Sequence, residues 1–468
     1  MLLWVVIPTA FSVGRVVATP LVFGLAGLML LGFVLGYSGL SRRIRHPGGL
    51  YVQVASGLGR SAGLGAAGLL FVAYIGLASG IYGLNALLLQ GLISTAAGVN
   101  VPIGVTLAIS VLAVQGLSLA PLRKVARILI VVVGIQVVIA LWFTSSALGS
   151  QTGGRVSVQA LDPGWLFSGS FVIALVLALT VGFIGSEGAA VYSNELANPY
   201  KSIPIATYLS YGVTTTILVL GSWAVSGAVG PEDAVGPNGA LPMTILSHLA
   251  GFAAIPSVQY LGFVAMYLGL LSTGVTLNNG GARQLAGLAQ DGVLPRSLTT
   301  AGTASAPPTR KALLVQPITA GTGAVIAILA TGNPLPLWLA VASGLGVLGV
   351  LALASAAAAV WFMRGAADET GFLGWEGQVV AGLFSVVTIG LVFGYGVTHV
   401  RQVAPGSPAA ASWLVGTTIA GTFTVGLAGA QYLRARRPAV YASIGGTRIN
   451  DERLVPRPAP RTEAVELA

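Results

Sequence analysis

The sequence predicts an all-α membrane protein with about twelve transmembrane helices. Of its 468 residues, 55% are hydrophobic and only 8% are charged, whereas soluble domains carry charge on about a quarter of their residues. The apolar runs repeatedly reach the roughly 20 residues that a helix needs to cross the hydrocarbon core of a bilayer. They lack the alternation of apolar and polar residues that marks the strands of membrane barrels. The spans are therefore predicted to be helices.

Apolar runs between turn signals define the individual spans. In chain order the predicted spans are 2–13 (short), 19–41, 63–93, 101–120, 126–147, 168–193, 204–229, 254–282, 312–331, 336–362, 378–399 and 411–433. Connectors rich in Gly, Pro and Asn separate them, as at 97–102, 230–233 and 331–334. The first run meets Gly14 and Arg15 too soon to cross the bilayer, so we expect an incomplete first helix.

The basic residues predict the orientation. With these spans, all of the 23 Lys and Arg residues except Arg15, Arg155 and Arg401 fall on one side. Cytoplasmic loops retain positive charge, so that side, including the C-terminus, is predicted to be cytoplasmic in a multi-pass cell-membrane protein. The net charge of +10 is then a topology signal and not a sign of nucleic-acid binding. The tail 434–468 is rich in Arg and Pro and is predicted to be disordered.

The sequence offers little for a cofactor, a metal or enzymatic chemistry. It has no cysteine, which excludes disulfides and thiolate metal sites. His46, His248 and His399 are scattered over loops and span ends, with no second ligand at metal spacing. No phosphate-binding Gly-Lys-Ser/Thr loop is present, and the spans hold no cluster of polar catalytic groups. We therefore expect no enzyme, no cofactor and no metal site.

The sixth span carries the most informative pattern. Around Thr180 to Ala190, three glycines (Gly182, Gly185 and Gly188) surround the carboxylate of Glu187. Glycine costs a helix about 1 kcal/mol relative to alanine, so this cluster predicts a break in the backbone. Where a membrane helix breaks, its free N–H and C=O groups need partners, and transporters use such breaks as binding sites near mid-membrane.

Glu187 has two readings. It is the only charged residue that we place well inside the hydrocarbon thickness, where a carboxylate costs a few kcal/mol and is often functional. It either takes part in gating, proton coupling or substrate contact, or caps the N–H groups of the second half-helix. The glycines also have a purely structural reading, because small residues let membrane helices approach closely, as we expect at Gly65 and Gly68.

Three segments together resemble a known family. The first comprises Phe183, Gly185, Glu187, Glu195, Asn198-Pro199, Lys201 and 203–206. The second is 281–295, in which Arg283 leads to Asp-Gly-Val-Leu-Pro, followed by the Pro-Thr-Arg at 308–310. The third and weaker one is 41–51. In order and spacing they are similar to the amino acid–polyamine–organocation (APC) superfamily of permeases, from about residue 4 to about residue 433.

The resemblance implies a leucine-transporter-like fold, with two inverted repeats of five helices and two extra helices. The single permease domain 1–433 would comprise a truncated first repeat (1–165), a second repeat (166–362) and the extra helices (378–433). Substrate would lie against the broken sixth helix. The implied contacts are Val181, Gly182, Phe183, Ile184, Gly185 and Ser186. Ser186 stands where many relatives carry an aromatic residue, which leaves the size and polarity of the substrate open.

Coupling also stays open. In sodium-coupled relatives a Ser/Thr pair on the eighth helix helps to bind the ion, a role that Ser272 and Thr273 could fill, although such hydroxyls more often bond their own backbone. A lysine in the fifth helix serves some proton-coupled relatives, and this chain has Gln136 in that span instead. The coupling ion would be H⁺ or Na⁺. Tyr74 and Tyr82 of the third span either line the path or belong to the core.

The segment after the sixth span is predicted to lie at the cytoplasmic surface. Asn198-Pro199 and Ile203-Pro204 end one helix and start the next, because proline is tolerated best in a first turn. Glu195 and Lys201 form either a structural salt bridge or a gate.

The leading interpretation is a secondary active transporter that moves an amino acid or a related amine across the cytoplasmic membrane by alternating access. An amine or polyamine exchanger is the close alternative. Members of the family carry a glycine-rich break midway along the first helix, and this sequence starts after it. Three alternatives therefore remain open. The start codon lies upstream of Met1, or the protein is a non-transporting membrane receptor, or it is an inactive truncated permease. Substrate identity and oligomeric state do not follow from the sequence.

Overall fold

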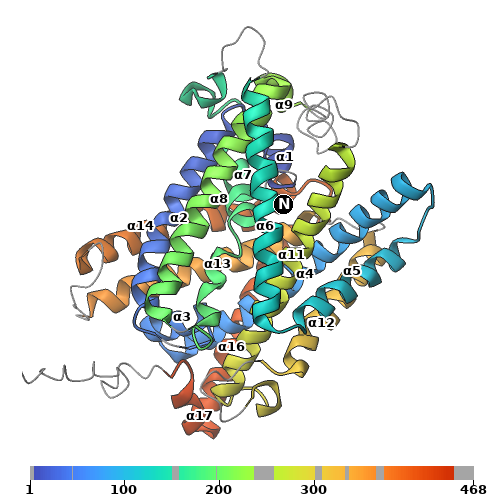
Figure 1. The fold of residues 1–468 in the computed structure, drawn as a ribbon. Helices are drawn as coiled ribbons and strands as arrows, with labels where there is room; N and C mark the ends of the chain where they lie inside the picture. Colours follow the sequence, from blue (N-terminus) through green and yellow to red (C-terminus); the bar gives the residue numbers. More distant parts are fainter. Residues whose placement is uncertain are drawn as a thin grey trace, which may run out of the picture.

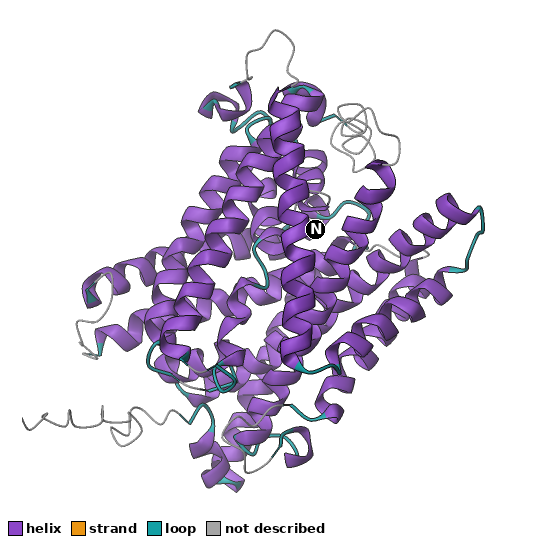
Figure 2. Ribbon diagram, viewed as in Figure 1, coloured by secondary structure: helices purple, strands orange, loops and turns teal. Residues whose placement is uncertain are grey.

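The computed structural model describes residues 5–44, 46–149, 158–196, 198–236, 258–300, 308–331, 337–364 and 374–446. Figure 2 shows that these residues form helices joined by loops. Apart from one isolated bridge between Thr299 and Pro308, the described part of the chain contains no β-structure. The predicted all-α class is confirmed.

The helices follow one another along the chain as Figure 1 labels them. They are α1 (Ile7–Thr9), α2 (Thr19–Ser41), α3 (Leu50–Leu58), α4 (Arg60–Ala97), α5 (Ile103–Ser118), α6 (Leu122–Gly149), α7 (Phe171–Leu177), α8 (Pro199–Val229), α9 (Pro231–Ala234), α11 (Val258–Gln290), α12 (Arg310–Thr331), α13 (Leu337–Met363), α14 (Trp375–Thr398), α15 (Val400–Val403), α16 (Ala411–Arg436) and α17 (Pro438–Ser443). The shorter π and 3₁₀ turns are η2 (Ala10–Gly14), η3 (Gln159–Leu161), η4 (Pro163–Trp165), η5 (Ala178–Gly182), η6 (Ser186–Tyr192) and η7 (Arg296–Leu298).

These elements match the predicted spans closely. Within the described residues, nine helices are long and apolar enough to cross a membrane, and α5 is a shorter apolar helix. The first apolar run ends with η2 at Gly14, and Arg15 after it adopts a left-handed backbone conformation with φ 52°. The truncation of this helix remains a prediction. The inverted pairing of the two repeats and the domain boundaries remain predictions.

Two elements differ from the sequence-based expectation. A separate helix, α3, precedes the third span and turns into α4 at Gly59, where φ is +98°. Residues 434–446, expected to begin a disordered tail, continue α16 to Arg436 and then form α17. The rest of the predicted tail, 447–468, lies outside the described residues.

Helix α4 organises the bundle. Its 38 residues span about 57 Å, which exceeds the roughly 30 Å hydrocarbon core and requires a tilt. It contacts α3, α5, α11, α12, α13 and α16. Figure 1 shows α4 running obliquely through the bundle, from the end with α3 toward α5.

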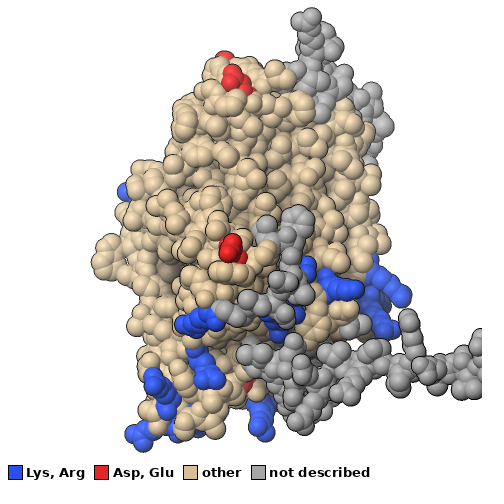
Figure 3. Space-filling view, turned by 90° about the vertical axis from the view of Figure 1, so that its left-hand side faces the viewer, with Lys and Arg blue, Asp and Glu red and all other residues tan. Residues whose placement is uncertain are grey.

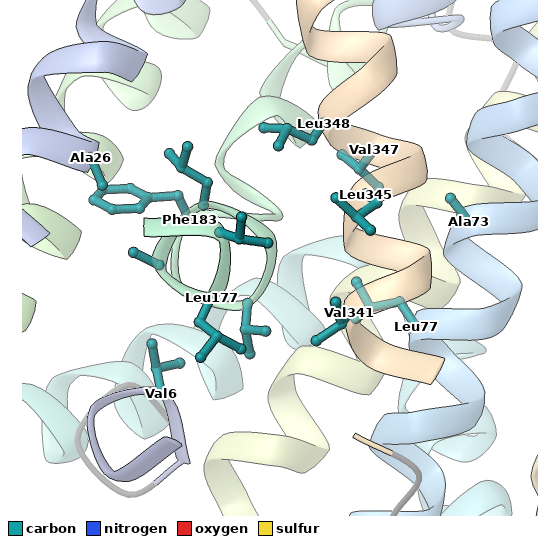
Figure 4. Close-up of a cluster of buried hydrophobic side chains, with 14 of the residues drawn as sticks. Val6, Ala26, Ala73, Leu77, Leu177, Phe183, Val341, Leu345, Val347 and Leu348 are labelled. Atoms are coloured by element: carbon teal, nitrogen blue, oxygen red, sulfur yellow. The ribbon is translucent and has the colours of Figure 1, made fainter. Parts of the chain in front are cut away.

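The apolar core surrounds the sixth segment. Leu177 and Phe183 lie between α2 on one side and α13 on the other, with Leu345 and Val347 among the α13 side chains (Figure 4). Close approach requires Gly344, because a Cβ there would collide with the carbonyl oxygen of Thr180. The core therefore holds the sixth segment firmly against α13.

Charge separates along the long axis of the molecule. On the face in Figure 3, Lys and Arg gather mainly toward the lower end, where Figure 1 places α3 and α17, while acidic residues show at the upper end and about halfway down. This matches the one-sided distribution of Lys and Arg in the sequence.

Candidate functional site

The sixth segment is interrupted. Helix α7 continues into the π-helical η5, which ends at Gly182, and the 3₁₀-helical η6 starts at Ser186. The turn between them uses Gly185 with φ +105°, a conformation that glycine adopts at the least cost. The predicted break between Gly182 and Gly188 is confirmed. It leaves peptide groups without helical partners in a segment otherwise apolar enough to span the membrane.

One side of the break is packed and the other is open. Phe183 is only 2% exposed, and its ring stacks on Tyr211 of α8 with centroids 6.1 Å apart. Gly185 is exposed, and a Cβ at Gly185 or at Gly188 would meet no atom within 4 Å. On the neighbouring α11, a Cβ at Gly280 would also meet open space. Open space therefore borders the backbone of the break at Gly185 and Gly188.

Glu187 bridges the break to the third span. Its side chain is 1% exposed. Its Oε2 accepts a hydrogen bond of 2.8 Å from the Gly185 N–H, and its Oε1 accepts one of 3.0 Å from the Tyr74 hydroxyl. The carboxylate thus stabilises the turn locally and also ties the turn to α4. The capping interaction foreseen for Glu187 is present, and it leaves a gating or coupling role open.

A second tyrosine, Tyr37, binds η6, the part of the sixth span that follows the break. The Tyr37 hydroxyl of α2 donates to the carbonyl oxygen of Glu187 at 2.7 Å and accepts from the Ala190 N–H at 3.0 Å. It therefore satisfies two backbone groups of η6. Sequence reasoning missed Tyr37, because a tyrosine in an apolar span looks like any other core residue.

An ion pair lies just after η6 along the chain. Arg283 of α11 donates from Nε to Glu195 Oε1 at 2.6 Å and from Nη2 to Oε2 at 3.1 Å. Its guanidinium also lies 4.2 Å from the centre of the Tyr192 ring. Its Nη1 donates to the carbonyl and side-chain oxygens of Asn279, both at 3.1 Å. The side chains are 5% and 15% exposed, so water screens the pair little.

This pairing corrects the grouping of Glu195 with Lys201. In the structure the partner of Glu195 is Arg283, whereas Lys201 is exposed at the start of α8. Both Glu195 and Arg283 belong to the motifs that the sequence singled out. No sequence pattern indicated that the two motifs meet in space.

The family is shown by comparison with known sequences. A sequence profile described as "Amino acid permease" matches residues 4–315, which include the broken segment and the ion pair. The chain belongs to the amino acid permease family. It is thereby placed in the APC superfamily, whose members transport amino acids or amines across membranes. No curated protein matches the chain in sequence.

The remaining residues of the family motifs have local roles in this permease. Ser272 and Thr273 both donate to the carbonyl oxygen of Gly269, at 2.7 and 2.9 Å, which is the backbone bonding common for hydroxyls in membrane helices. Asn198 is the N-cap residue of α8, and Pro199 occupies its first turn. The second proline, Pro204, lies inside α8 and does not begin a helix.

Other polar residues of the permease take no part in the break. The Tyr82 ring is buried in α4, and Gln136 donates to the carbonyl oxygen of Ala265 at 2.6 Å. His46 contacts Asp291, and His399 stacks on Tyr395. Among the residues that the structure describes, no group of three or more His, Cys, Asp or Glu could hold a metal ion. His248 lies outside those residues, as does the side chain of Ser186.

Gly185 and Gly188 offer a matched test of the break. Both positions have room for a methyl group, but only Gly185 has a positive φ. We expect Gly185→Ala to destabilise the permease by about 1–2 kcal/mol through backbone strain. Gly188→Ala should be neutral or slightly stabilising, because alanine is favoured over glycine where the backbone conformation suits both. Thermal unfolding of both variants in detergent measures the difference, and equal melting temperatures would contradict the strained turn.

Proposed function

We propose that this permease is a secondary active transporter that moves an amino acid or a related amine across the cytoplasmic membrane by alternating access. The observation that supports it is the interruption at 183–185, which is packed against Tyr211 on one side and open on the other. We place the basic end of the molecule, with the C-terminus, in the cytoplasm.

The substrate contacts we propose are mostly backbone groups. Val181 and Gly182 are buried where η5 ends, and the Phe183 ring is occupied by its stacking on Tyr211. Because the Gly185 N–H and C=O already bond Glu187 and the Gly188 N–H, the groups we propose for a solute are the peptide groups of Ile184 and Ser186, together with the half-buried side chain of Ile184. Peptide dipoles at a helix break suit both the carboxylate and the ammonium group of an amino acid.

The proposed cytoplasmic gate is the ion pair of Glu195 and Arg283. It joins the segment after η6 to α11, so inward release of substrate requires these two elements to separate. Lys201 is exposed and takes no part in this proposal.

Two coupling ions fit the residues. Glu187 is buried and bound by neutral donors, Tyr74 and the Gly185 N–H, so it can carry a proton through the cycle. The hydroxyl oxygens of Ser272 and Thr273 lie together on α11, where both donate to the carbonyl oxygen of Gly269, and hydroxyl oxygens can also serve as ligands for Na⁺. In proteoliposomes, accumulation driven by an inward H⁺ gradient and not by an inward Na⁺ gradient would favour Glu187, and the reverse would favour the hydroxyl pair.

The test of the function is uptake by the purified permease in proteoliposomes. We expect saturable uptake of one or a few radiolabelled amino acids or polyamines from a panel offered singly. Uptake only into vesicles preloaded with an amine would identify the exchanger instead. Saturable binding without any uptake would contradict transport and favour the receptor.

The truncated-permease alternative needs its own comparison. A protein extended upstream in the reading frame is reconstituted beside the 468-residue chain. Uptake by the extended protein alone would assign transport to the longer form, and equal uptake by both would remove this alternative.

A further inference from the structure

The chain returns to the cytoplasmic end after its last membrane helix. Helix α17 and residues 444–446, here called the C-terminal latch (438–446), dock beside α3 and the end of α11. Ile444 is 1% exposed and lies in an apolar cluster with Tyr51, Val52 and Leu288. Burial of this isoleucine stabilises the docked position, because its apolar surface is removed from water.

Asp291 is the polar centre of the docked latch. Its Oδ2 accepts from the Tyr51 hydroxyl at 2.9 Å and from the Gly445 N–H at 3.0 Å, while its Oδ1 lies 3.0 Å from His46 Nε2. Its carbonyl oxygen accepts from the Ser443 hydroxyl at 2.6 Å. A residue only 5% exposed thus joins the loop before α3, α3 itself and the latch.

Further contacts join the latch to the start of α4. The Tyr441 and Ser61 hydroxyls are 3.2 Å apart, and the guanidinium of Arg60 lies 5.9 Å from the centre of the Tyr441 ring. Val440 packs near Gly292. The latch is therefore attached both to α3 with the start of α4 and to the end of α11, two parts of the chain that are far apart in the sequence.

Helix α11 connects the latch to the proposed gate. Arg283, which holds Glu195, lies about 12 Å along the helix from Asp291. Between them, Gly287 approaches Gly48 so closely that a Cβ would lie 3.1 Å from the Gly48 Cα. The cytoplasmic end of α11 is thus clamped against α3 and its preceding loop by the same residues that bind the latch.

We propose that the C-terminal latch restrains the cytoplasmic gate, and that it must release the end of α11 each time the permease opens inward. This inference rests on the proposed transport function. The physical reason is that Arg283 lies on α11 and Asp291 directly follows it. Contacts that hold Asp291 in place therefore also restrict the movement of Arg283. The latch then sets how fast the permease turns over.

A reversible cross-link tests the inference. The natural chain has no cysteine, so Gly292→Cys with Val440→Cys introduces a single possible disulfide. A Cβ at Gly292 would lie 3.7 Å from both γ-carbons of Val440, so the Val440 Cβ lies just beyond 4 Å, inside the Cβ separation of a disulfide, about 3.5–4.5 Å. We expect oxidation to lower uptake of a mixture of radiolabelled standard amino acids and polyamines at least tenfold, and reduction to restore it. The two single-cysteine variants are the controls and should be insensitive to oxidation.

A pair of truncations tests the opposite change. Removing 438–468 deletes the latch, whereas removing 447–468 keeps it. We expect the longer deletion to raise the initial uptake rate at least threefold over the shorter one. Unchanged uptake by the cross-linked protein would overturn the latch, even if the longer deletion fails to fold. No uptake by the wild-type protein in the same vesicles would overturn the proposed transport function, and the latch with it.

Discussion

Replacing Glu187 with alanine should lower uptake at least tenfold while the permease still inserts and folds. The substitution removes the acceptors of two hydrogen bonds, from the Gly185 N–H and from the Tyr74 hydroxyl. The buried Tyr74 hydroxyl left without a partner costs about 1–3 kcal/mol, and the turn also loses the bond from its Gly185 N–H, which together are enough to shift the backbone at the break without unfolding a bundle of this size. Initial uptake rates in proteoliposomes, normalised to the reconstituted protein, measure the effect.

Two neighbouring substitutions separate capping from coupling. Tyr74→Phe removes one of the two hydrogen bonds and keeps the carboxylate, so we expect a smaller loss than in Glu187→Ala. Glu187→Gln keeps an acceptor oxygen and removes the titratable group. If Glu187 carries the coupled proton, the Gln variant should exchange substrate across the membrane without accumulating it. Wild-type rates in Glu187→Ala would contradict any functional role and leave only the cap.

The break and its carboxylate could be predicted, because both are local features. Three glycines around a charged residue in an apolar span contradict a continuous helix, whatever surrounds it. The partners of Glu187 could not be predicted. Tyr37 and Tyr74 lie 150 and 113 residues away along the chain, and neither differs in pattern from a core tyrosine.

The length of an element decided how well it could be predicted. The long spans follow from hydropathy alone, since a helix in lipid must satisfy all its backbone groups internally. Helix α3 has only nine residues and includes Gln53 and Ser56, so it resembled a loop. The C-terminal latch could not be predicted for another reason. Its composition is that of a polar tail, and its order depends on Asp291, far earlier in the chain.

The ion pair is the second place where a substitution should have a large effect, and again the partners come from distant motifs. Glu195 follows the broken helix, while Arg283 lies on α11, where Asn279 and the Tyr192 ring also hold its guanidinium. Lysine cannot reproduce the two parallel hydrogen bonds or the stacking on the ring. We therefore expect the Arg283→Lys variant to lose most of the wild-type uptake rate, although the positive charge at this position is conserved.

Arg283→Ala should abolish uptake, because it leaves the Glu195 carboxylate partly buried without its cation. Removing one partner of a buried pair costs about 3–5 kcal/mol, whereas replacing both partners by neutral residues costs far less. The double variant Glu195→Gln with Arg283→Gln should therefore fold better than either single variant in a detergent melting assay. If the pair is a gate, this stable double variant should still bind substrate but let it leak down its gradient without coupling to an ion. Tightly coupled accumulation by the double variant would instead show that the pair only fastens η6 to α11.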